Sequence, residues 1–534
     1  MIFKLSLIIF FLNFPNLNYK EKNIVLDYEY SIPNFIEGFY FADKNIQTTK
    51  NYEIKALIVP HHLTATKTIA AGFKMLAEQK FQEMIIISPD HFSTCEQFIC
   101  TTDKNFEIFL GKIFISKKNL NVLKNFDFVK INNDIFYKEH GIHALLPYIK
   151  NYFPKIKITP LVLSQHKKYK KEKALNLLKK LFSKNSMLVI SSDFSHYLNF
   201  FEANKRDQET MEKIFSKDFF GILKLNNPQN SDCPLCLWLI SQIADENNFY
   251  NPSVIMHSNS AEILNDKNSS NTTSHFAITY YKNFSLGDDL VFAGDVSFTR
   301  KKQREINLGP KTSDFWEKNK TRVVNLEGPV LENCKTSKNP YIFCNEKNFF
   351  EKKSHLATHW NTVNNHMYDF YDYKKTPKNI IKLGKIPLVK NKFFEDEKIK
   401  IFSFTAVLNP INGNFHHNID ENYDQIIQNL KNKNNKKLNI IYIHYGEEFR
   451  VLPSDYDFGL LKNFIDAGAD AVIGHHNHVI GGIYIYKEKP IFTSLGNFIF
   501  DQTKKFSTKN SMLVKIRKNK DKVEFETWIG DPME

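Results

Sequence analysis

Short apolar runs alternate with amphipathic stretches along most of the chain. In the first half, strands are predicted at residues 55–59, 84–88, 157–163, 187–191 and 275–281, with helices at 66–79 and 174–182. In the second half, strands are predicted at residues 290–293, 322–324, 400–404, 438–443, 471–473, 483–486 and 491–494, with a helix over 460–465. Strands that alternate with helices in this way predict an α/β fold.

A short hydrophilic segment at residues 282–288 separates the two series of elements. We therefore predict two domains, at residues 50–283 and 288–531, after a loosely patterned lead-in at residues 20–50. Two large domains suit a chain of 534 residues better than four small ones. The lysine-rich stretch 374–400 is predicted to be an excursion within the second domain.

Composition and charge narrow the class of protein. Hydrophobic residues make up 42% of the chain and charged residues 24%, which is typical of globular domains and excludes a disordered or collagen-like chain. The net charge of +14 is scattered rather than gathered in one arm, and we recognise no nucleic-acid-binding module. The densest basic run, at residues 167–180, predicts a solvated amphipathic helix, with weak attraction to anionic polymers or membranes as the alternative.

The N-terminus bears on the location of the protein. Lys4 precedes about ten mostly apolar residues that resemble a short signal peptide, so residues 1–20 are expected to be a leader or a membrane anchor. The apolar segment is short for a membrane span, and a buried strand is the alternative. We expect an extracytoplasmic or membrane-anchored protein, with a cytoplasmic location as the alternative. Six cysteines in three close pairs suit export but are too few for a disulfide scaffold.

Polar side chains of the first domain follow its predicted strands, where open α/β sheets place their sites. Three groups follow strands directly: His61 and His62, Asp90 and His91, and Asp193 and His196. Two further groups are Glu139 with His140, and Asp232 with Cys233 at the start of a helix-like run. One histidine after a strand is more often a structural hydrogen-bonding group than a ligand. Several histidines with a cysteine favour a metal site, and imidazole with thiolate suits iron, copper or zinc.

The order of these motifs resembles the MEMO-like family, which includes AmmeMemoRadiSam system protein B. The resemblance rests on VPHH, IIISPDHF, EHGIHALLPYI, ITPLVL, VISSDFSHY and SNSAEIL, over roughly residues 54–282. It implies a fold like that of class III extradiol dioxygenases, one iron or copper ion, and partners among the AmmeMemoRadiSam components. The implied metal ligands are His61, His91 and Cys233.

The resemblance also implies roles for the neighbouring side chains. Asp193 and His196 would be acid–base groups or would support the ligands, and Glu139 and His140 would line the cavity. Because Pro234 follows the cysteine where the family has glycine, Asp232 is a substitute candidate for the third ligand. An alternative interpretation of Cys233 and Cys236 is a redox pair or a disulfide.

A second series of polar motifs follows the strands of the second domain. It comprises Gly294-Asp295, Asn325-Leu-Glu327, Asn364-Asn365-His366, His444-Tyr-Gly-Glu447, Gly474-His-His476-Asn-His478 and Ser494-Leu-Gly-Asn497. Carboxylate and amide oxygens that converge with several imidazoles are what a binuclear hydrolase needs, because two metals activate a water and stabilise the developing charge. Strand-end turns with chance histidines are the alternative.

These motifs resemble the CapA family of poly-γ-glutamate and capsule biosynthesis proteins, which is similar to the calcineurin-type metallophosphoesterases. The resemblance rests on NLEGP, HYGEEF, FIDAGADAVIGHHNHV and IYIYKEKPIFTSLGNFIFD. It implies an α/β/β/α sandwich that holds two ions of the manganese, zinc or iron type. The implied roles are one metal on Asp295 and His478, the other on Asn365, His444 and His476, a bridging Glu327, an acid or donor in His366, and support from Asn325, Glu447 and Asn497.

Three functional hypotheses follow from these patterns. In the first, the second domain is a metal-dependent hydrolase or processing factor acting on an anionic cell-envelope polymer or a small-molecule substrate. In the second, the protein is a non-enzymatic assembly or export factor whose metals are structural. In the third, the first domain carries the main activity and is an iron- or copper-dependent redox module.

Overall fold

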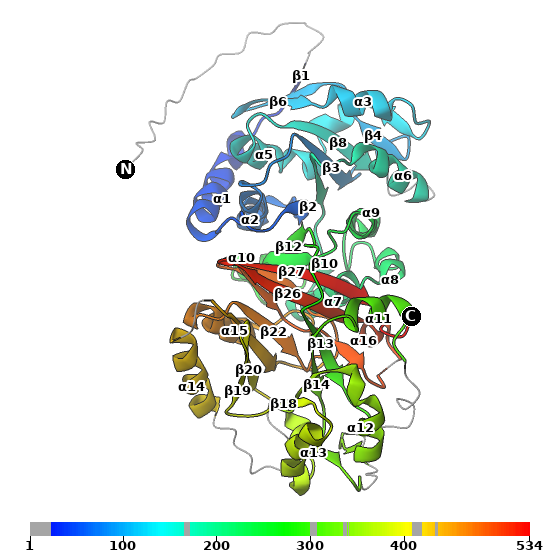
Figure 1. Cartoon of the computed structure of the whole chain (residues 1–534). Helices are drawn as coiled ribbons and strands as arrows, with labels where there is room; N and C mark the ends of the chain where they lie inside the picture. Colours follow the sequence, from blue (N-terminus) through cyan, green and yellow to red (C-terminus); the bar gives the residue numbers. More distant parts are fainter. Residues whose placement is uncertain are drawn as a thin grey trace, which may run out of the picture.

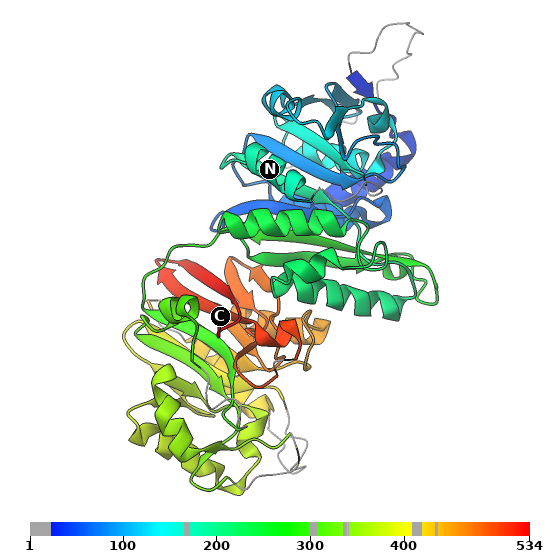
Figure 2. The same cartoon turned by 90° about the vertical axis from the view of Figure 1, so that its right-hand side faces the viewer.

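The computed structural model describes residues 23–164, 171–299, 307–334, 339, 341–407, 419–432, 436–502 and 504–534. Figures 1 and 2 show two halves stacked one above the other. The predicted leader at residues 1–20 lies outside the described residues, as does the start of the predicted basic helix. None of the helices within the described ranges is long and apolar enough to cross a membrane.

The first half is built on one sheet of twelve strands, in which β1, β5, β6, β8, β3, β9, β2, β12 and β10 lie side by side in that order. Its four central strands, β8, β3, β9 and β2, run parallel and are almost fully buried, which explains their near-continuous apolar sequences. The strands are β1 (Asn23–Val25), β2 (Ile54–Val59), β3 (Glu83–Pro89), β4 (Ile99–Thr101), β5 (Asn105–Ile108), β6 (Gly111–Ile115), β7 (Val129–Ile131), β8 (Lys157–Leu163), β9 (Ser186–Ser191), β10 (His196–Leu198), β11 (Pro252–Asn259) and β12 (Thr272–Tyr281).

Helices connect these strands, and the first of them precedes the predicted start of the domain at residue 50. Strand β1 pairs in parallel with β5, so the segment expected to be a lead-in belongs to the sheet. The helices are α1 (Ile32–Asn45), α2 (Thr66–Met75), α3 (Lys117–Leu123), α4 (His140–His143), α5 (Leu146–Tyr152), α6 (Lys171–Leu181), α7 (Phe200–Phe215), α8 (Phe219–Leu223), α9 (Pro234–Glu246) and α10 (Ser260–Ile263).

The second half contains two large sheets that face each other. One has the order β18, β17, β14, β13, β26, β27, with β25 beside β13, and the other has the order β19, β20, β21, β22, β24, β23. The hydroxyl of Tyr442 on β21 donates a hydrogen bond of 2.6 Å to the carbonyl oxygen of Ala293 on β13, which ties the sheets together. The mixed α/β class and its metallophosphoesterase-like second half are therefore as predicted.

The strands of this half are β13 (Leu290–Val296), β14 (Thr321–Leu326), β15 (Val330–Leu331), β16 (Asn345–Glu346), β17 (His359–Asn361), β18 (Ile386–Leu388), β19 (Phe393–Glu395), β20 (Ile399–Thr405), β21 (Leu438–His444), β22 (Ala471–His475), β23 (Ile483–Tyr486), β24 (Lys489–Phe492), β25 (Asn497–Ile499), β26 (Ser511–Asn519) and β27 (Lys522–Gly530). Its helices are α11 (Pro310–Trp316), α12 (Lys347–Lys353), α13 (Thr376–Lys382), α14 (Ile419–Lys431), α15 (Asp455–Ala467) and α16 (Phe506–Lys509).

The two halves share one continuous hydrophobic core, and their contact is sealed by β26 and β27, drawn in red in Figure 1. Tyr52, which is buried, donates a hydrogen bond of 2.7 Å to the carbonyl oxygen of Val523 and packs against the ring of Phe525. Asn510 donates a 2.6 Å bond to the carbonyl oxygen of Ser216. The two halves therefore pack directly against each other and are not joined by a linker alone.

Candidate metal centres

Side chains of the second half converge where the parallel strands of its two sheets end. Asp295 comes from β13, Asn325 and Glu327 from the end of β14, and His444 from the end of β21. The turn after β22 adds His475, His476 and His478, and a short 3-10 helix (Asn365–Tyr368) adds Asn365 and His366. Apart from Glu447, the residues predicted for this centre therefore lie around one point.

Glu327 is the residue that most strongly favours a cation site. It is fully buried, and neither of its carboxylate oxygens has a hydrogen-bond partner among the described residues. Burial, and then the charge of Asp295, raises the pKa of Glu327 well above its ordinary value. A buried carboxylate without partners costs free energy unless a proton or a metal ion balances it, so the arrangement fits a bound cation.

Asp295 lies at the centre of the cluster. It accepts hydrogen bonds from Asn325 Nδ2 at 2.8 Å and from the backbone N–H of His476 at 3.1 Å. The Nδ1 atoms of His478 and His475 lie 3.4 and 3.5 Å from its two oxygens. Burial opposes ionisation of Asp295, but the bond from His475 and the charge of His478 outweigh it and lower its pKa.

Burial holds two imidazoles of the centre, those of His444 and His476, in the neutral form. Burial, with the neighbouring imidazoles, lowers the pKa of His444 well below its ordinary value and that of His476 to about 3. His444 Nε2 lies 2.8 Å from Asn365 Oδ1, and its Nδ1 lies 2.9 Å from His475 Nδ1. His476 Nδ1 is buried and has no partner among the described residues. Neutral imidazole is the form that binds a metal ion.

Two overlapping groups suit a pair of ions. Ligand atoms of Glu327, His444 and His476 lie within 4.8 Å of one another, and so do those of Asp295, Glu327 and His478. Glu327 belongs to both groups, which matches its predicted bridging position. A third group joins Asp295, His444 and His475. His475 was not among the predicted ligands, although it stands directly before His476 in the sequence.

Supporting contacts agree with the prediction for some residues and not for others. Asn497 Oδ1 lies 2.9 Å from His478 Nδ1, while its Nδ2 donates to the carbonyl oxygen of Thr508, so the amide orients the imidazole. The carboxylate of Glu447 does not reach the centre: its side chain is 73% exposed and pairs with Arg450. The next residue, Glu448, places its charge near Glu327 instead.

A strained turn presents the two histidines of the His-x-His pair. The φ angles are 102° at His476 and 58° at His478, both in the left-handed region that disfavours residues other than glycine. Such strained backbone is kept only where several surrounding contacts hold it in place, and it is frequent at functional sites. Here the contacts are those of His476 N with Asp295 and of His478 with Asn497.

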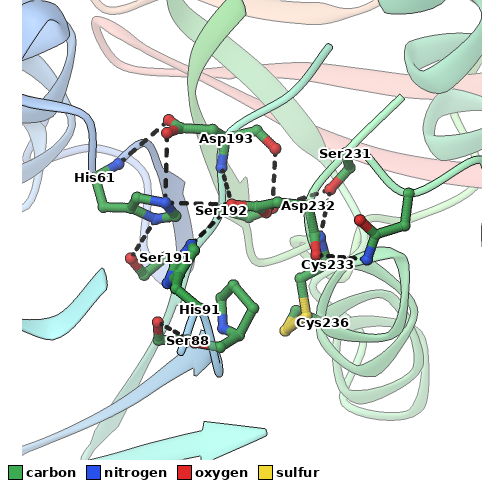
Figure 3. Close-up of a disulfide and its surroundings, with 12 residues drawn as sticks. His61, Ser88, His91, Ser191, Ser192, Asp193, Ser231, Asp232, Cys233 and Cys236 are labelled. Carbon is green, nitrogen blue, oxygen red and sulfur yellow. Dashed lines mark hydrogen bonds and ion pairs between the residues drawn. A yellow bond between two sulfur atoms is a disulfide. The ribbon is translucent and has the colours of Figure 1, made fainter. Parts of the chain in front are cut away.

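A second cluster forms in the first half, where β2, β3 and β9 end (Figure 3). His61 Nε2 lies 3.2 Å from Asp232 and 3.4 Å from Asp193. His91 Nε2 lies 3.6 Å from Asp232, and its Nδ1 lies 2.6 Å from Glu139. The side chains of His61, Asp193 and Asp232 are buried and lie close enough to share one ion.

The carboxylates of this cluster favour the protonated form of His91. Burial disfavours protonation of His91, but Asp232 and Glu139 outweigh it and raise its pKa to about 10. Burial, with the charges of His91 and His61, lowers the pKa of His140 to about 4. His140 packs against His91 with ring centroids 4.0 Å apart, so Glu139 and His140 lie at the cluster as predicted.

The predicted ligand Cys233 needs correction. Its sulfur forms a disulfide with Cys236, drawn in yellow in Figure 3, so no thiolate faces the histidines. Asp232, the substitute candidate, contacts both His61 and His91. Cys233 precedes α9, and the disulfide ties the start of this helix to its first turn. The alternative interpretation of this cysteine pair as a disulfide is the one that the structure bears out.

Asp193 has a further partner that the sequence did not suggest. His275 on β12 is buried, and its Nδ1 lies 3.1 Å from Asp193 Oδ1. His196 lies at the start of β10, where its Nδ1 is 2.6 Å from the carbonyl oxygen of Phe194, and its charge contributes to lowering the pKa of Asp193. His275 was not predicted because it lies within a strand and outside the strand-end motifs. Asp193 and His196 were predicted because they share one such motif.

Comparisons with known proteins identify each half separately. Residues 28–274 match the family model described as Memo-like protein, and residues 389–502 match that of bacterial capsule synthesis protein PGA_cap. Over 70 residues the chain is 47% identical to the capsule biosynthesis protein CapA of Bacillus anthracis, which covers 13% of this chain and 17% of that protein.

Two further relatives agree with this division. Over 63 residues the chain is 44% identical to the PGA biosynthesis protein CapA of Bacillus subtilis, covering 12% of this chain and 17% of that one. Over 185 residues it is 24% identical to a MEMO1 family protein of Nitrosopumilus maritimus, covering 33% of this chain and 67% of that one. The matched segment thus spans about a sixth of the length of these CapA proteins.

Proposed function

Because the chain is a fusion of a Memo-like domain with a CapA-like domain, we propose that its second half holds two divalent metal ions and cleaves an ester or amide bond. The substrate class we propose is an anionic cell-envelope polymer of the poly-γ-glutamate or capsule type. The relatives named for capsule and PGA biosynthesis support this class. The single observation that carries the proposal is the buried Glu327 carboxylate without partners, set between neutral imidazoles.

The residues of the centre would divide the work of hydrolysis. Asp295 and His478 would hold one ion, Asn365, His444 and His476 the other, and Glu327 would bridge the two. Ions held there would supply a nucleophile at neutral pH and neutralise developing negative charge. His475 lies within reach of both Asp295 and His444, so it would fix their orientation.

His366 is placed to move a proton. Its Nδ1 lies 2.9 Å from Asp369 Oδ2, and this carboxylate orients the ring for a role as general acid. The ring packs edge-on against Phe343, with centroids 4.1 Å apart. With its Nδ1–H bonded to the carboxylate, the doubly protonated ring of His366 can give the Nε2 proton to a leaving group.

Metal content and hydrolysis, measured together, test this function. The purified full chain is expected to bind two equivalents of manganese, zinc or iron in its second half and to cleave a phosphodiester or poly-γ-glutamate. His444→Ala should abolish metal-dependent hydrolysis, and His476→Ala should also release bound metal. His355→Ala, at an exposed histidine of the same half, is the control. Full activity of the His444 variant would overturn the proposal, and polymer binding by a metal-free variant without any cleavage would favour an assembly factor instead.

The cluster in the first half supports a second candidate function. We propose that His61, His91 and Asp232 hold one iron or copper ion in a redox module, with Asp193 as a further oxygen ligand. Carboxylate and imidazole are ligands that iron accepts. Iron or copper that is lost with His61→Ala but retained with His476→Ala would support the module, and zinc or manganese bound only through His476 would count against it.

We propose an extracytoplasmic location, supported by the pairing of all six cysteines. Cys95 bonds to Cys100, Cys233 to Cys236 and Cys334 to Cys344. Disulfides persist in oxidising compartments and are rare in the cytosol. A fusion of alkaline phosphatase, which is active only where its own disulfides form, to the full chain should be active, and a fusion that is produced but inactive would refute the location.

A further inference from the structure

A cleft of about 940 Å³ lies between the two halves. The first half contributes the segment at the end of α1, Met75 of α2, helix α7, strand β11 and Glu262 of α10. The second half contributes Arg450, residues 452–455, α15, β23 and residues 487–488. In Figure 1, α1 lies above the boundary between the two halves and α15 lies below it, on the same side of the molecule. Its volume and its position at a domain interface are those of small-molecule sites, and none of its lining residues belongs to either metal centre.

The two walls of the cleft differ in charge. Among the lining residues of the first half, the formally charged side chains are Asp207 and Glu262. Asp207 is buried, its Oδ2 lies 3.2 Å from His257 Nε2, and its Oδ1 has no partner among the described residues. This wall therefore carries two carboxylates, one of which has a buried oxygen without a partner among the described residues.

The opposite wall carries three cations, Arg450, Lys462 and Lys487, and two carboxylates, Asp455 and Glu488, so its formal charge is positive. Lys462 Nζ lies 4.9 Å from the ring centroid of Phe458 and 5.9 Å from that of Tyr486, and Lys462 has no ion pair with a described residue. Arg450 is fixed by a 2.9 Å bond from its Nε to the carbonyl oxygen of Leu452, and its Nη1 lies 3.3 Å from Glu447 Oε2. A cation held over aromatic faces keeps its capacity to bind an anion.

Part of the cleft lining is apolar. Strands β11 and β23 meet there and contribute Val254, Ile255 and Tyr484. A ligand that fills the cleft would therefore have a charged group at each end and an apolar or neutral body between them.

We propose that this cleft binds a zwitterionic amino-acid derivative or short peptide. Its ammonium group would face Asp207 and Glu262, and its carboxylate would face Lys462 and Arg450. The inference stands apart from the function proposed for either metal centre, because it rests on other residues.

Calorimetric titration of the full chain with dipeptides tests the inference. The probes are alanyl-leucine and γ-glutamylglutamate, each also as the N-acetylated form, which lacks the ammonium group, and as the C-terminal amide, which lacks that carboxylate. At least one free dipeptide is expected to bind. Each blocked form should bind about tenfold more weakly, because each loses a hydrogen bond to a charged group.

Variants assign the two ends of the ligand. Glu262→Gln, at an exposed position, and Asp207→Asn should weaken binding of the free dipeptide and leave the N-acetylated form unaffected. Lys462→Gln should weaken the free dipeptide about tenfold and leave the C-terminal amide unaffected. Lys180, which lies over the ring of Phe126 at 5.1 Å and outside the cleft, gives the matched control Lys180→Gln.

Three outcomes would overturn the inference. The first is that no free dipeptide binds. The second is that a blocked form binds as tightly as the free one. The third is that Lys462→Gln and Lys180→Gln have the same effect. Binding that survives in a metal-stripped His476→Ala variant would separate this site from the metal centre.

Discussion

At the scale of single residues, Glu327 makes the folding stability of the metal-free protein depend on pH. Folding raises its pKa above the ordinary value of 4.5, so the folded chain keeps a proton that the unfolded chain releases. The stability that this proton contributes is fully present below the ordinary carboxyl pKa. It is lost as the pH rises toward the raised value.

Glu327→Gln removes this dependence. In the presence of a chelator, the variant and the wild type should have similar melting temperatures near about pH 5, and the variant should be more stable near about pH 8. Each kcal/mol gained raises Tm by about 2–4 °C in a domain of this size. Thermal scans over this pH range measure the difference. Added manganese should reverse the order, because the wild type alone keeps the bridging carboxylate, and a variant that still gains stability from metal would contradict the assignment.

Asp232 and Cys233 offer a second comparison between neighbouring residues. Asp232→Asn should lower metal affinity of the first half at least about tenfold and lower the pKa of His91 from about 10, because it removes one of the two carboxylates that raise it. The Cys233→Ser, Cys236→Ser double variant should bind metal as the wild type does. Metal titration and histidine NMR measure the two effects.

Asp127→Asn, at an exposed aspartate of the same half, is the control for this comparison. If the serine double variant lost the metal and Asp232→Asn kept it, the cysteine would be the ligand after all.

At the scale of elements, one side chain of the first half holds a loop of the second. Gln208 on α7 accepts hydrogen bonds of 3.1 Å from the backbone N–H groups of both Val451 and Leu452. The same loop carries Glu448, whose charge acts on Glu327, and Phe449, whose ring lies 6.2 Å from that of His478. Helix α7 therefore helps to position one side of the metal centre.

Gln208→Ala should loosen this loop. The two N–H groups would lose their acceptor, at a cost of about 1–3 kcal/mol for each group that stays buried. Hydrogen exchange over residues 447–453 should accelerate. Gln208→Glu keeps an acceptor oxygen and should restore slow exchange, and equally fast exchange in both variants would mean that the loop is held by other contacts.

Elements were predictable where burial leaves a clear pattern. The central strands appear in the sequence as apolar runs, so β8 is found at its predicted bounds. Helix α1 was missed because its three buried residues, Phe35, Gly38 and Ala42, sit among exposed aromatic and aliphatic side chains such as Ile36 and Tyr40. Strand β1 was missed because three residues carry too little pattern.

The candidate sites were predictable to the level of strand ends and not beyond. Which of two adjacent acids, Glu447 or Glu448, lets its charge act on Glu327 depends on the turn after β21, and the sequence does not reveal it. His475 was missed because the His-x-His pair already supplied two ligands. The disulfide partner of Cys233 decides whether its sulfur can bind a metal, and spacing alone left both possibilities open.

At the scale of the whole molecule, the shared core predicts joint unfolding of the halves. Tyr52 is buried at the contact with β27, so Tyr52→Ala should destabilise the entire chain by about 3 kcal/mol, and Tyr52→Phe by about 1 kcal/mol through loss of the bond to Val523. Calorimetry should record one transition for the wild type. Two separate transitions, with Tyr52→Ala shifting only the first half, would show that the halves unfold independently.

The position of β27 in the chain sets an order of events during synthesis. The surface of the first half that carries Tyr52 and Phe284 is covered by Phe525, which leaves the ribosome some 240 residues after Phe284 (525 against 284). Until then, this aromatic surface is exposed to water or is bound by a chaperone. A nonsense mutation just before Lys522 would spare every predicted metal ligand and still leave the first half uncovered, so we expect such a product to aggregate or to be degraded.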